Sequence, residues 1–203
     1  MSTMPENTQR VARRAFKYVN RLMLLNWRLG MGPYISFWPH GIGHFLLLIH
    51  TGRKSGVQRR TPINYAESDG DIYVTAAFGQ HTHWYKNIVA HPQVEVWLPD
   101  AWWQAETEDV TGSAHHTTML REVLKGSGFA AYMAGINPHT MSDDKLNAAT
   151  MNYRLLRMRR TTPCIGNGSP GDLIWVWPMI CTGLLLLVLY RFVRQGHYDD
   201  SRN

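Results

Sequence analysis

The chain has 203 residues, of which 44% are hydrophobic, so it can bury a core and does not have the composition of a disordered protein. Its net charge is +6, and its two cysteines form no CxxC pair, which argues against a disulfide framework and a cysteine zinc site. The N-terminus has no continuous apolar stretch typical of a cleavable signal peptide, so we do not expect secretion.

Positive charge is concentrated in the first third of the chain. No acidic residue occurs between Glu6 and Glu67, a stretch that contains ten lysines and arginines. Such a region needs an anionic partner. Total charge alone does not choose among nucleic acid, a membrane surface and a phosphorylated or polycarboxylate ligand.

Residues 8–29 have the pattern of an amphipathic helix. Arginines and lysines lie on a stripe beside an apolar stripe of Val11, Ala15, Tyr18, Leu22, Leu25 and Leu29. This helix could lie at a membrane interface, or it could pack on the domain with a solvated basic flank.

The middle of the chain alternates apolar runs with turn residues. We expect strands at residues 44–50, 61–66, 72–78, 94–98, 102–110 and 153–160. Helices are expected at residues 83–90, 113–125 and 142–151, the last two with serine caps. The short spacings indicate an α+β domain built on an antiparallel meander that the last strand closes into a barrel.

The C-terminal part divides the chain further. Residues 1–162 form the expected barrel domain, 163–171 a Gly-, Pro- and Ser-rich linker, 172–193 a hydrophobic membrane anchor and 194–203 a tail. The anchor could span the bilayer or lie in its interface. The alternative is a buried strand, residues 173–177, followed by a core helix. Arginines on both sides only slightly favour a globular domain that faces the cytoplasm.

Two short motifs could bind a ligand. Residues 51–56, TGRKSG, combine two glycines with cations and are followed by Arg59 and Pro62, which predicts a phosphate cradle with free backbone N–H groups. The spacing is not that of a Walker A loop, and a basic turn can also be solvated surface. In residues 83–87, HWYKN, Trp84 and Asn87 share a helical face that could address a flat polar ring or pack into the core.

Together the segments GRKSGVQR, residues 52–59, and HWYKNIVAHPQVEV, residues 83–96, resemble the deazaflavin (F420)-dependent nitroreductase and F420H2-dependent quinone reductase family. The resemblance covers roughly residues 15–161, including residues 125–132 and the strand near Tyr153. It implies a split β-barrel like that of flavin mononucleotide-binding proteins. It also implies hydride transfer from reduced coenzyme F420 to a quinone, a nitro compound or an activated double bond, with no metal.

The resemblance also implies roles for individual residues. The coenzyme phosphate and acidic tail would be held by Arg53, Lys54, Ser55, Gly56 and Arg59. Adjacent strand positions that shape this site are Leu47, Leu48, Ile49, Thr51 and Pro62. Near the deazaflavin ring or the substrate we expect Ala76, Ala77, Trp84, Tyr85 and Asn87. The candidate proton donors are Tyr132, which ranks first, Tyr85, Tyr34 or a neighbouring histidine.

Two alternatives remain: a flavin mononucleotide-dependent reductase on the same barrel, and a membrane-tethered module that binds F420 without turnover. The histidines have no partners at metal-ligand spacing, so we expect no metal site. The expected location is the cell membrane, with the globular domain on the cytoplasmic side. The expected partners are a small-molecule electron acceptor such as a membrane quinone, membrane lipid and a second copy in a homodimer, but no nucleic acid.

Overall fold

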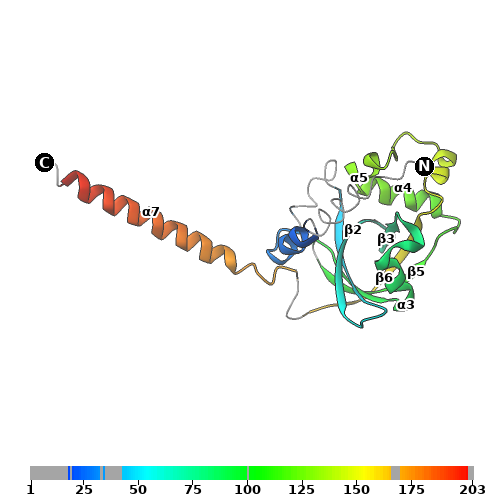
Figure 1. The fold of residues 1–203 in the computed structure, drawn as a ribbon, viewed down its shortest axis with the longest axis horizontal. Helices are drawn as coiled ribbons and strands as arrows, with labels where there is room; N and C mark the ends of the chain where they lie inside the picture. The colour runs from blue at the N-terminus through cyan, green and yellow to red at the C-terminus, as the bar shows by residue number, and fades with distance from the viewer. Residues whose placement is uncertain are drawn as a thin grey trace.

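Six antiparallel strands close a barrel in the computed structural model (Figure 1). The structure describes residues 18, 20–32, 34, 43–99, 101–165 and 170–200, with only the backbone for 192–200. In barrel order the strands are β1 (Phe45–Thr51), β2 (Gln58–Ser68), β3 (Asp71–Ala76), β6 (Arg154–Pro163), β5 (Trp102–Asp109) and β4 (Gln93–Trp97). The predicted split β-barrel with flanking helices is therefore confirmed.

The strand order differs from the continuous meander that the sequence suggested. The chain runs β1–β2–β3 as a meander, but β4 then returns to pair with β1, with Leu48 opposite Val96. The last strand, β6, lies between β3 and β5. These pairings join segments far apart in the chain, which local turn signals do not encode.

The strand β1 is buried on both faces, which accounts for its continuous apolar sequence. Leu46 and Leu48 belong to the core inside the barrel. Leu47 and Ile49 point to the outside, where they pack with Trp97 of β4 and with Trp27 of the N-terminal helical segment. Full burial of each of these side chains contributes about 1.5–3 kcal/mol.

Trp27 covers the outer face of β1 from a helical segment at residues 20–28. In its described part, the apolar stripe expected for this helix does not pack on the barrel. Three of its members are exposed, namely Tyr18, Leu22 and Leu25. The barrel instead selects Trp27, which is 2% exposed, because a large flat side chain covers the outward-facing aliphatic residues. The expected residues 8–17 lie outside the described residues.

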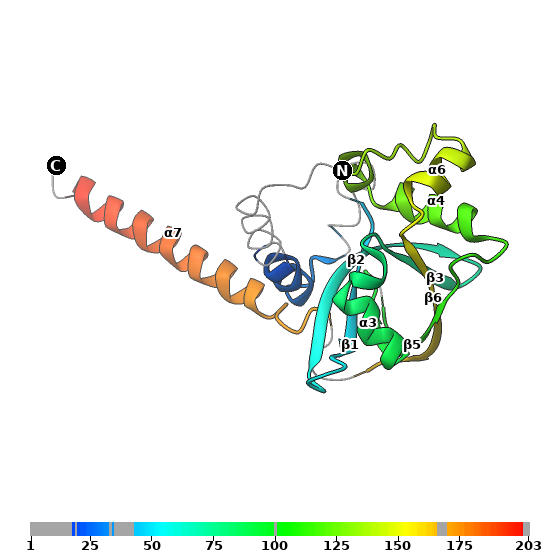
Figure 2. The same ribbon diagram turned by 45° about the vertical axis from the view of Figure 1, so that its right-hand side comes forward.

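Three of the four α-helices between β3 and β6 were expected. They are α3 (His83–Ala90), α4 (His116–Gly126) and α6 (Asp143–Ala149), with the short α5 (Phe129–Met133) in addition. The helix α3 lies against β1 and β5 and places Ile88 in the barrel core, while α4 packs across β2 and β3 (Figure 2).

The expected serine caps were only partly right. Ser113 lies in a turn three residues before α4, so it is not a cap. Ser142 does occupy the position before α6, but its side chain makes no capping hydrogen bond.

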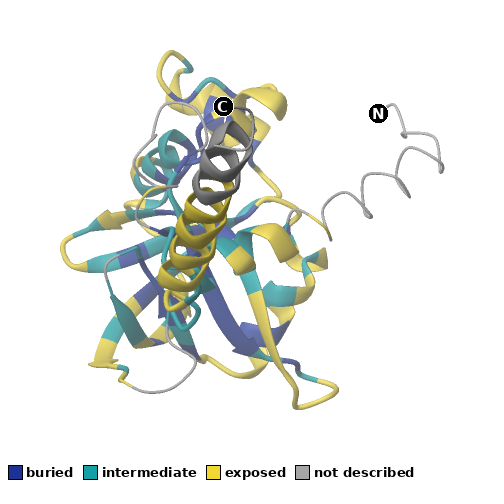
Figure 3. Cartoon of the chain, turned by 90° about the vertical axis from the view of Figure 1, so that its left-hand side faces the viewer, coloured by how far each residue is buried: buried dark blue, intermediate teal, exposed yellow. Residues whose placement is uncertain are grey.

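The last helix, α7 (Val176–Asp200), projects away from the barrel, and its described side chains are largely exposed (Figures 1 and 3). The alternative of a buried strand followed by a core helix is therefore wrong. Among the described residues, no helix combines the length and the apolar character required to cross a membrane, so the structure does not support a spanning anchor.

The base of α7 is fastened to the N-terminal helical segment. Arg28 donates hydrogen bonds from Nε and Nη2 to Asp172 Oδ2 over 3.1 and 2.9 Å. The Leu173 N–H donates to the Arg28 carbonyl over 2.8 Å, and the Trp177 indole N–H donates to the Leu29 carbonyl over 3.0 Å. Residues near both ends of the described chain therefore meet at one junction beside β1.

Candidate functional site

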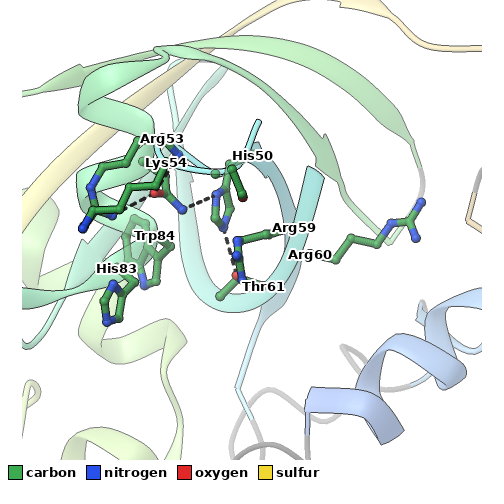
Figure 4. Close-up of a pocket in the computed structure, with 11 residues that line it drawn as sticks. His50, Arg53, Lys54, Arg59, Arg60, Thr61, His83 and Trp84 are labelled. Atoms are coloured by element: carbon green, nitrogen blue, oxygen red, sulfur yellow. Dashed lines mark hydrogen bonds between the residues drawn. The ribbon is translucent and has the colours of Figure 1, made fainter. Parts of the chain in front are cut away.

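A cavity of about 550 Å³ lies between the β1–β2 loop and the start of α3. We call it the cationic cavity (Figure 4). It is lined by His50, Gly52, Arg53, Lys54, Ser55, Arg59, Arg60, Thr61, His83, Trp84 and Asn87. These residues include four permanent cations and no carboxylate, so the cavity favours an anionic ligand.

Three of the four cations are free to meet such a ligand. Arg60 extends away from the others and stacks on the Trp97 ring, 5.4 Å from its centroid. Arg53, Lys54 and Arg59 form no ion pair with any carboxylate among the described residues. A phosphate or carboxylate in the cavity would thus supply the missing counter-charge.

Two glycines allow the tight loop that carries these cations. A Cβ on Gly52 would lie 2.8 Å from Ser55 Oγ and 3.0 Å from Arg59 Nε, whereas Gly56 has φ +66° and open space around it. The N–H groups of Gly52, Ser55 and Gly56 all bond to carbonyls within the loop. The expected cradle of free backbone N–H groups is thus wrong at these positions, and the charge comes from side chains.

Asn87 ties this loop to α3. It is 4% exposed, and its Oδ1 accepts hydrogen bonds from the Arg53 backbone N–H over 3.2 Å and from Arg53 Nη1 over 3.0 Å. Its Nδ2 donates to His50 Nδ1 over 3.2 Å. The amide therefore holds the base of the loop, in addition to lining the cavity.

His50 completes this network inside the wall of the cavity. It is 3% exposed, and its Nε2 lies 3.1 Å from Thr61 Oγ1. Burial, followed by the nearby charge of Arg59, lowers the pKa of His50 to about 4. The imidazole is therefore neutral at physiological pH.

A second cavity of about 240 Å³ lies on the other side of Trp84, which lines both. We call it the neutral cavity, because no charged side chain lines it. Its walls come from β2, β3, the segment before α3 and the helices α4 and α5, together with Tyr153. Small side chains shape much of it, and its polar groups include Asn64, Thr75 and Thr82.

The structure brings most of the expected cofactor residues to these two cavities. The cationic cavity contains Arg53, Lys54, Ser55, Arg59, Trp84 and Asn87. The neutral cavity contains Pro62, Ala77 and again Trp84. The remaining expected positions line neither cavity and belong to the barrel wall or flank the loop: Leu47, Leu48, Ile49, Thr51, Gly56 and Ala76.

The expected proton donors lie elsewhere. The Tyr85 hydroxyl donates to Asp109 Oδ2 over 2.6 Å, and burial and this bond raise its pKa to about 12. Tyr132 is half-exposed and lines a separate cavity beside α4, and Tyr34 is 74% exposed. The tyrosine in the wall of the neutral cavity is Tyr153, whose pKa burial raises.

Sequence reasoning missed several residues of the cationic cavity. Thr61 follows Arg59 at the two-residue period of a strand, so alternation along β2 could have placed both on one side. His83 directly precedes Trp84 on the same helix. His50 gave no such signal, because it sits among buried aliphatic residues of β1.

A profile of the F420H(2)-dependent quinone reductase family matches residues 34–139, more than half of the chain. The chain belongs to the F420H2-dependent quinone reductase family. It is therefore an F420H2-dependent oxidoreductase, and its cofactor is coenzyme F420. The family assignment favours this activity over the flavin mononucleotide and non-catalytic alternatives.

Solved structures with a related fold include three of low sequence identity. An F420-H2 dependent reductase, FDR-A, is 20% identical over 57% of this chain and 93% of its own, with a TM-score of 0.41. A candidate 5-nitroimidazole antibiotic resistance protein from Bacteroides thetaiotaomicron is 9% identical over 60% and 75%, with a TM-score of 0.44. The haem storage protein HutZ from Vibrio cholerae is 13% identical over 66% and 90%, with a TM-score of 0.40. The family assignment rests on the profile match alone.

The residues of the cationic cavity fit the anionic part of the cofactor of the family. The unpaired cations suit a phosphate with an acidic tail. In the neutral cavity, Thr82 Oγ1 is buried without a hydrogen-bond partner, so a polar edge of a bound ring would satisfy it. The described residues contain no group of three or more His, Cys, Asp or Glu suited to a metal ion.

Proposed function

We propose that this protein passes a hydride from F420H2 to a quinone acceptor, and that the two cavities divide the task. The cationic cavity binds the phosphate and acidic tail of the coenzyme, and the neutral cavity receives the acceptor. The observation that carries this proposal is that the two cavities share Trp84 as a wall, so ligands in them would approach each other at its ring. Nitro compounds and activated double bonds are alternative acceptors.

The protein residues position the reactants. When bound, F420H2 supplies the hydride. Arg53, Lys54 and Arg59 fix the anionic part of the coenzyme, Trp84 forms the wall that the two cavities share, and the small side chains of the neutral cavity admit a flat acceptor. Tyr153 donates a hydrogen bond to the acceptor oxygen that gains negative charge, a role its burial favours because the hydroxyl stays protonated.

The test measures oxidation of F420H2 with menadione as acceptor, and compares NADPH as donor. We expect turnover with F420H2 alone, and a KM for F420H2 about a hundredfold higher in the Arg53→Ala, Lys54→Ala double variant, because two charge-assisted contacts are lost. The matched control removes two exposed cations elsewhere, Lys145→Ala and Arg159→Ala, and should leave the KM unchanged. Equal KM values in the two double variants would contradict the cationic cavity as the coenzyme site.

We further propose that α7 holds the enzyme at the cytoplasmic face of a membrane, where lipid quinones partition. Six consecutive apolar residues, 184–189, are exposed, and together they surround the whole circumference of the helix. The barrel does not bury them. Aromatic side chains flank this run, Trp175 and Trp177 on one side and Tyr190 on the other, as in membrane interfaces. Interfacial binding of α7 requires no span.

Co-sedimentation of the full chain with vesicles that contain anionic lipid tests this second proposal. We expect wild-type protein in the pellet and a Leu184→Glu, Leu187→Glu variant in the supernatant, because two charges would enter the apolar layer. Wild-type protein that stays in the supernatant would contradict membrane association without affecting the cofactor assignment.

A further inference from the structure

The residue His50 has a buried position that neither the family assignment nor the proposed hydride transfer explains. It lies on β1 behind the loop of the cationic cavity, with Arg59 as its partner on β2. It contacts none of the free cations through a hydrogen bond, yet it bonds to Asn87, which in turn bonds twice to Arg53 (Figure 4). Thr61, His50, Asn87 and Arg53 thus form one continuous chain of hydrogen bonds.

The donors and acceptors in this chain have only one consistent assignment. The Arg53 N–H and guanidinium can only donate, so the Asn87 oxygen must face them. The Asn87 NH2 group then faces His50 and can only donate, so His50 Nδ1 must carry a lone pair. The imidazole proton is therefore on Nε2, which donates to Thr61 Oγ1.

The surroundings of His50 favour this uncharged form. The loop contributes Arg53 and Lys54, β2 contributes Arg59 and Arg60, and α3 contributes His83 to the same cavity. No carboxylate lines it. A further positive charge at His50 would be buried among these cations, which agrees with its lowered pKa.

We infer that His50 is a positioning residue, which as a neutral imidazole fixes the Asn87 amide and thereby holds Arg53 toward the anionic ligand. This inference rests on the proposed role of the cationic cavity. Protonation of His50 would place an N–H at Nδ1 against the Asn87 NH2 group. Either this bond breaks, or the amide rotates and turns its NH2 group toward Arg53, which loses both of its bonds.

Two variants separate this role from simple packing. In His50→Asn a carbonyl oxygen can take the place of Nδ1 and accept from Asn87, whereas His50→Leu has a similar volume and no acceptor. We expect the Kd for F420, and separately for inorganic phosphate, to rise about tenfold in His50→Leu and to change less than threefold in His50→Asn. Thermal unfolding of both variants verifies that each is folded at the assay temperature.

The pH dependence of ligand binding distinguishes this role from packing, because a purely packing role of His50 would not make the Kd depend on its protonation. Between pH 7 and pH 4 the ratio of the wild-type Kd to that of His50→Asn should rise, because only the wild type carries the titrating imidazole, and ligand titration cancels in the ratio. NMR of the ligand-free protein should show the Arg53 backbone amide and the Asn87 side-chain amide shifting with the titration of His50. In His50→Asn neither signal should follow that titration.

The outcomes distinguish this inference from the proposed function. If the Arg53 and Asn87 signals do not respond to His50 and the His50→Leu variant binds both anions like wild type, the inference is wrong. If the Arg53→Ala, Lys54→Ala variant binds F420 like wild type, the proposed coenzyme site is wrong. The NMR titration of the ligand-free protein then still decides whether His50 controls Arg53.

Discussion

The two cavities that meet at Trp84 are built in different ways. The cationic cavity comes from one hairpin, strands β1 and β2 with their loop, and from one helix, and a buried network from Thr61 to Arg53 joins four of its residues. The neutral cavity collects uncharged side chains, many of them small, from several segments, with no comparable network among the described residues. A rigid, charged site suits a ligand that is always the same, and a site of small side chains suits acceptors that vary. Coenzyme binding in the cationic cavity should therefore respond to charge and pH, and acceptor binding in the neutral cavity should respond to side-chain volume.

The largest expected effect concerns how protein stability depends on the protonation of His50 in the cationic cavity. The pKa of His50 is about 4 in the folded protein against an ordinary value of 6.5, so the unfolded chain binds this proton more tightly. The contribution to stability is complete above about pH 6.5 and is lost as pH falls toward 4. Over this pH range, the free energy of unfolding of the wild type should fall by about 2 kcal/mol more than that of His50→Asn. Urea unfolding of both proteins across this range measures the difference, and parallel curves would contradict it.

The next largest effect should be that of ionic strength on the KM values, which should differ between the ligands of the two cavities. Raising the salt concentration from about 0.05 to 0.5 M screens the free cations, so the KM for F420H2 should rise about tenfold. The KM for menadione, which is uncharged, should stay within twofold. Steady-state kinetics with each substrate varied in turn provides the measurement. An equal response of both KM values would mean that the cavities do not divide the ligands by charge.

A smaller effect distinguishes the tyrosines. Tyr153→Phe should lower kcat about fivefold, because one hydrogen bond to the developing negative charge is lost. Tyr132→Phe, in a separate cavity, and Tyr85→Phe, whose hydroxyl bonds to Asp109, should leave kcat within twofold. Turnover numbers at saturating F420H2 and menadione compare the three variants. A large loss in Tyr132→Phe alone would restore the donor that the sequence favoured.

The smallest effect should come from narrowing the neutral cavity, which limits the size of the acceptor that it admits. Ala130 is an exposed residue in the wall of the neutral cavity, so Ala130→Leu narrows the cavity without disturbing the core. We expect the KM for menadione to rise about threefold and the Kd for F420 to stay unchanged. Ala114→Leu, an exposed position outside both cavities, is the control. A change in F420 binding instead would show that the coenzyme extends along this wall.

Local patterns in the sequence predicted the elements that carry the site. The helix α3 was expected with the bounds that the structure gives, because the aromatic and apolar residues after Thr82 have helical spacing and Pro92 limits the helix. The loop from Gly52 to Gly56 was expected from its glycines and charges. Both features depend on residues within a few positions of each other, and sequence reasoning is strongest there.

Features that depend on distant residues could not be predicted. The pairing of β6 with β3 and the packing of Trp27 on β1 are set by the closed barrel. The neutral cavity has no signature of its own, since its lining comes from positions between 62 and 153. The role of His50 depends on an amide 37 positions later in the chain. Tyr132 ranked first as donor because no local pattern reveals which cavity a tyrosine faces.

The junction between Arg28 and Asp172 has a mechanical consequence. Because the base of α7 is bonded to the same short segment that carries Trp27, a force on the helix passes through Trp27 to the outer face of β1. The strand β1 leads directly into the loop of the cationic cavity. A pull or tilt of α7 would therefore act on the strand that leads into the coenzyme site.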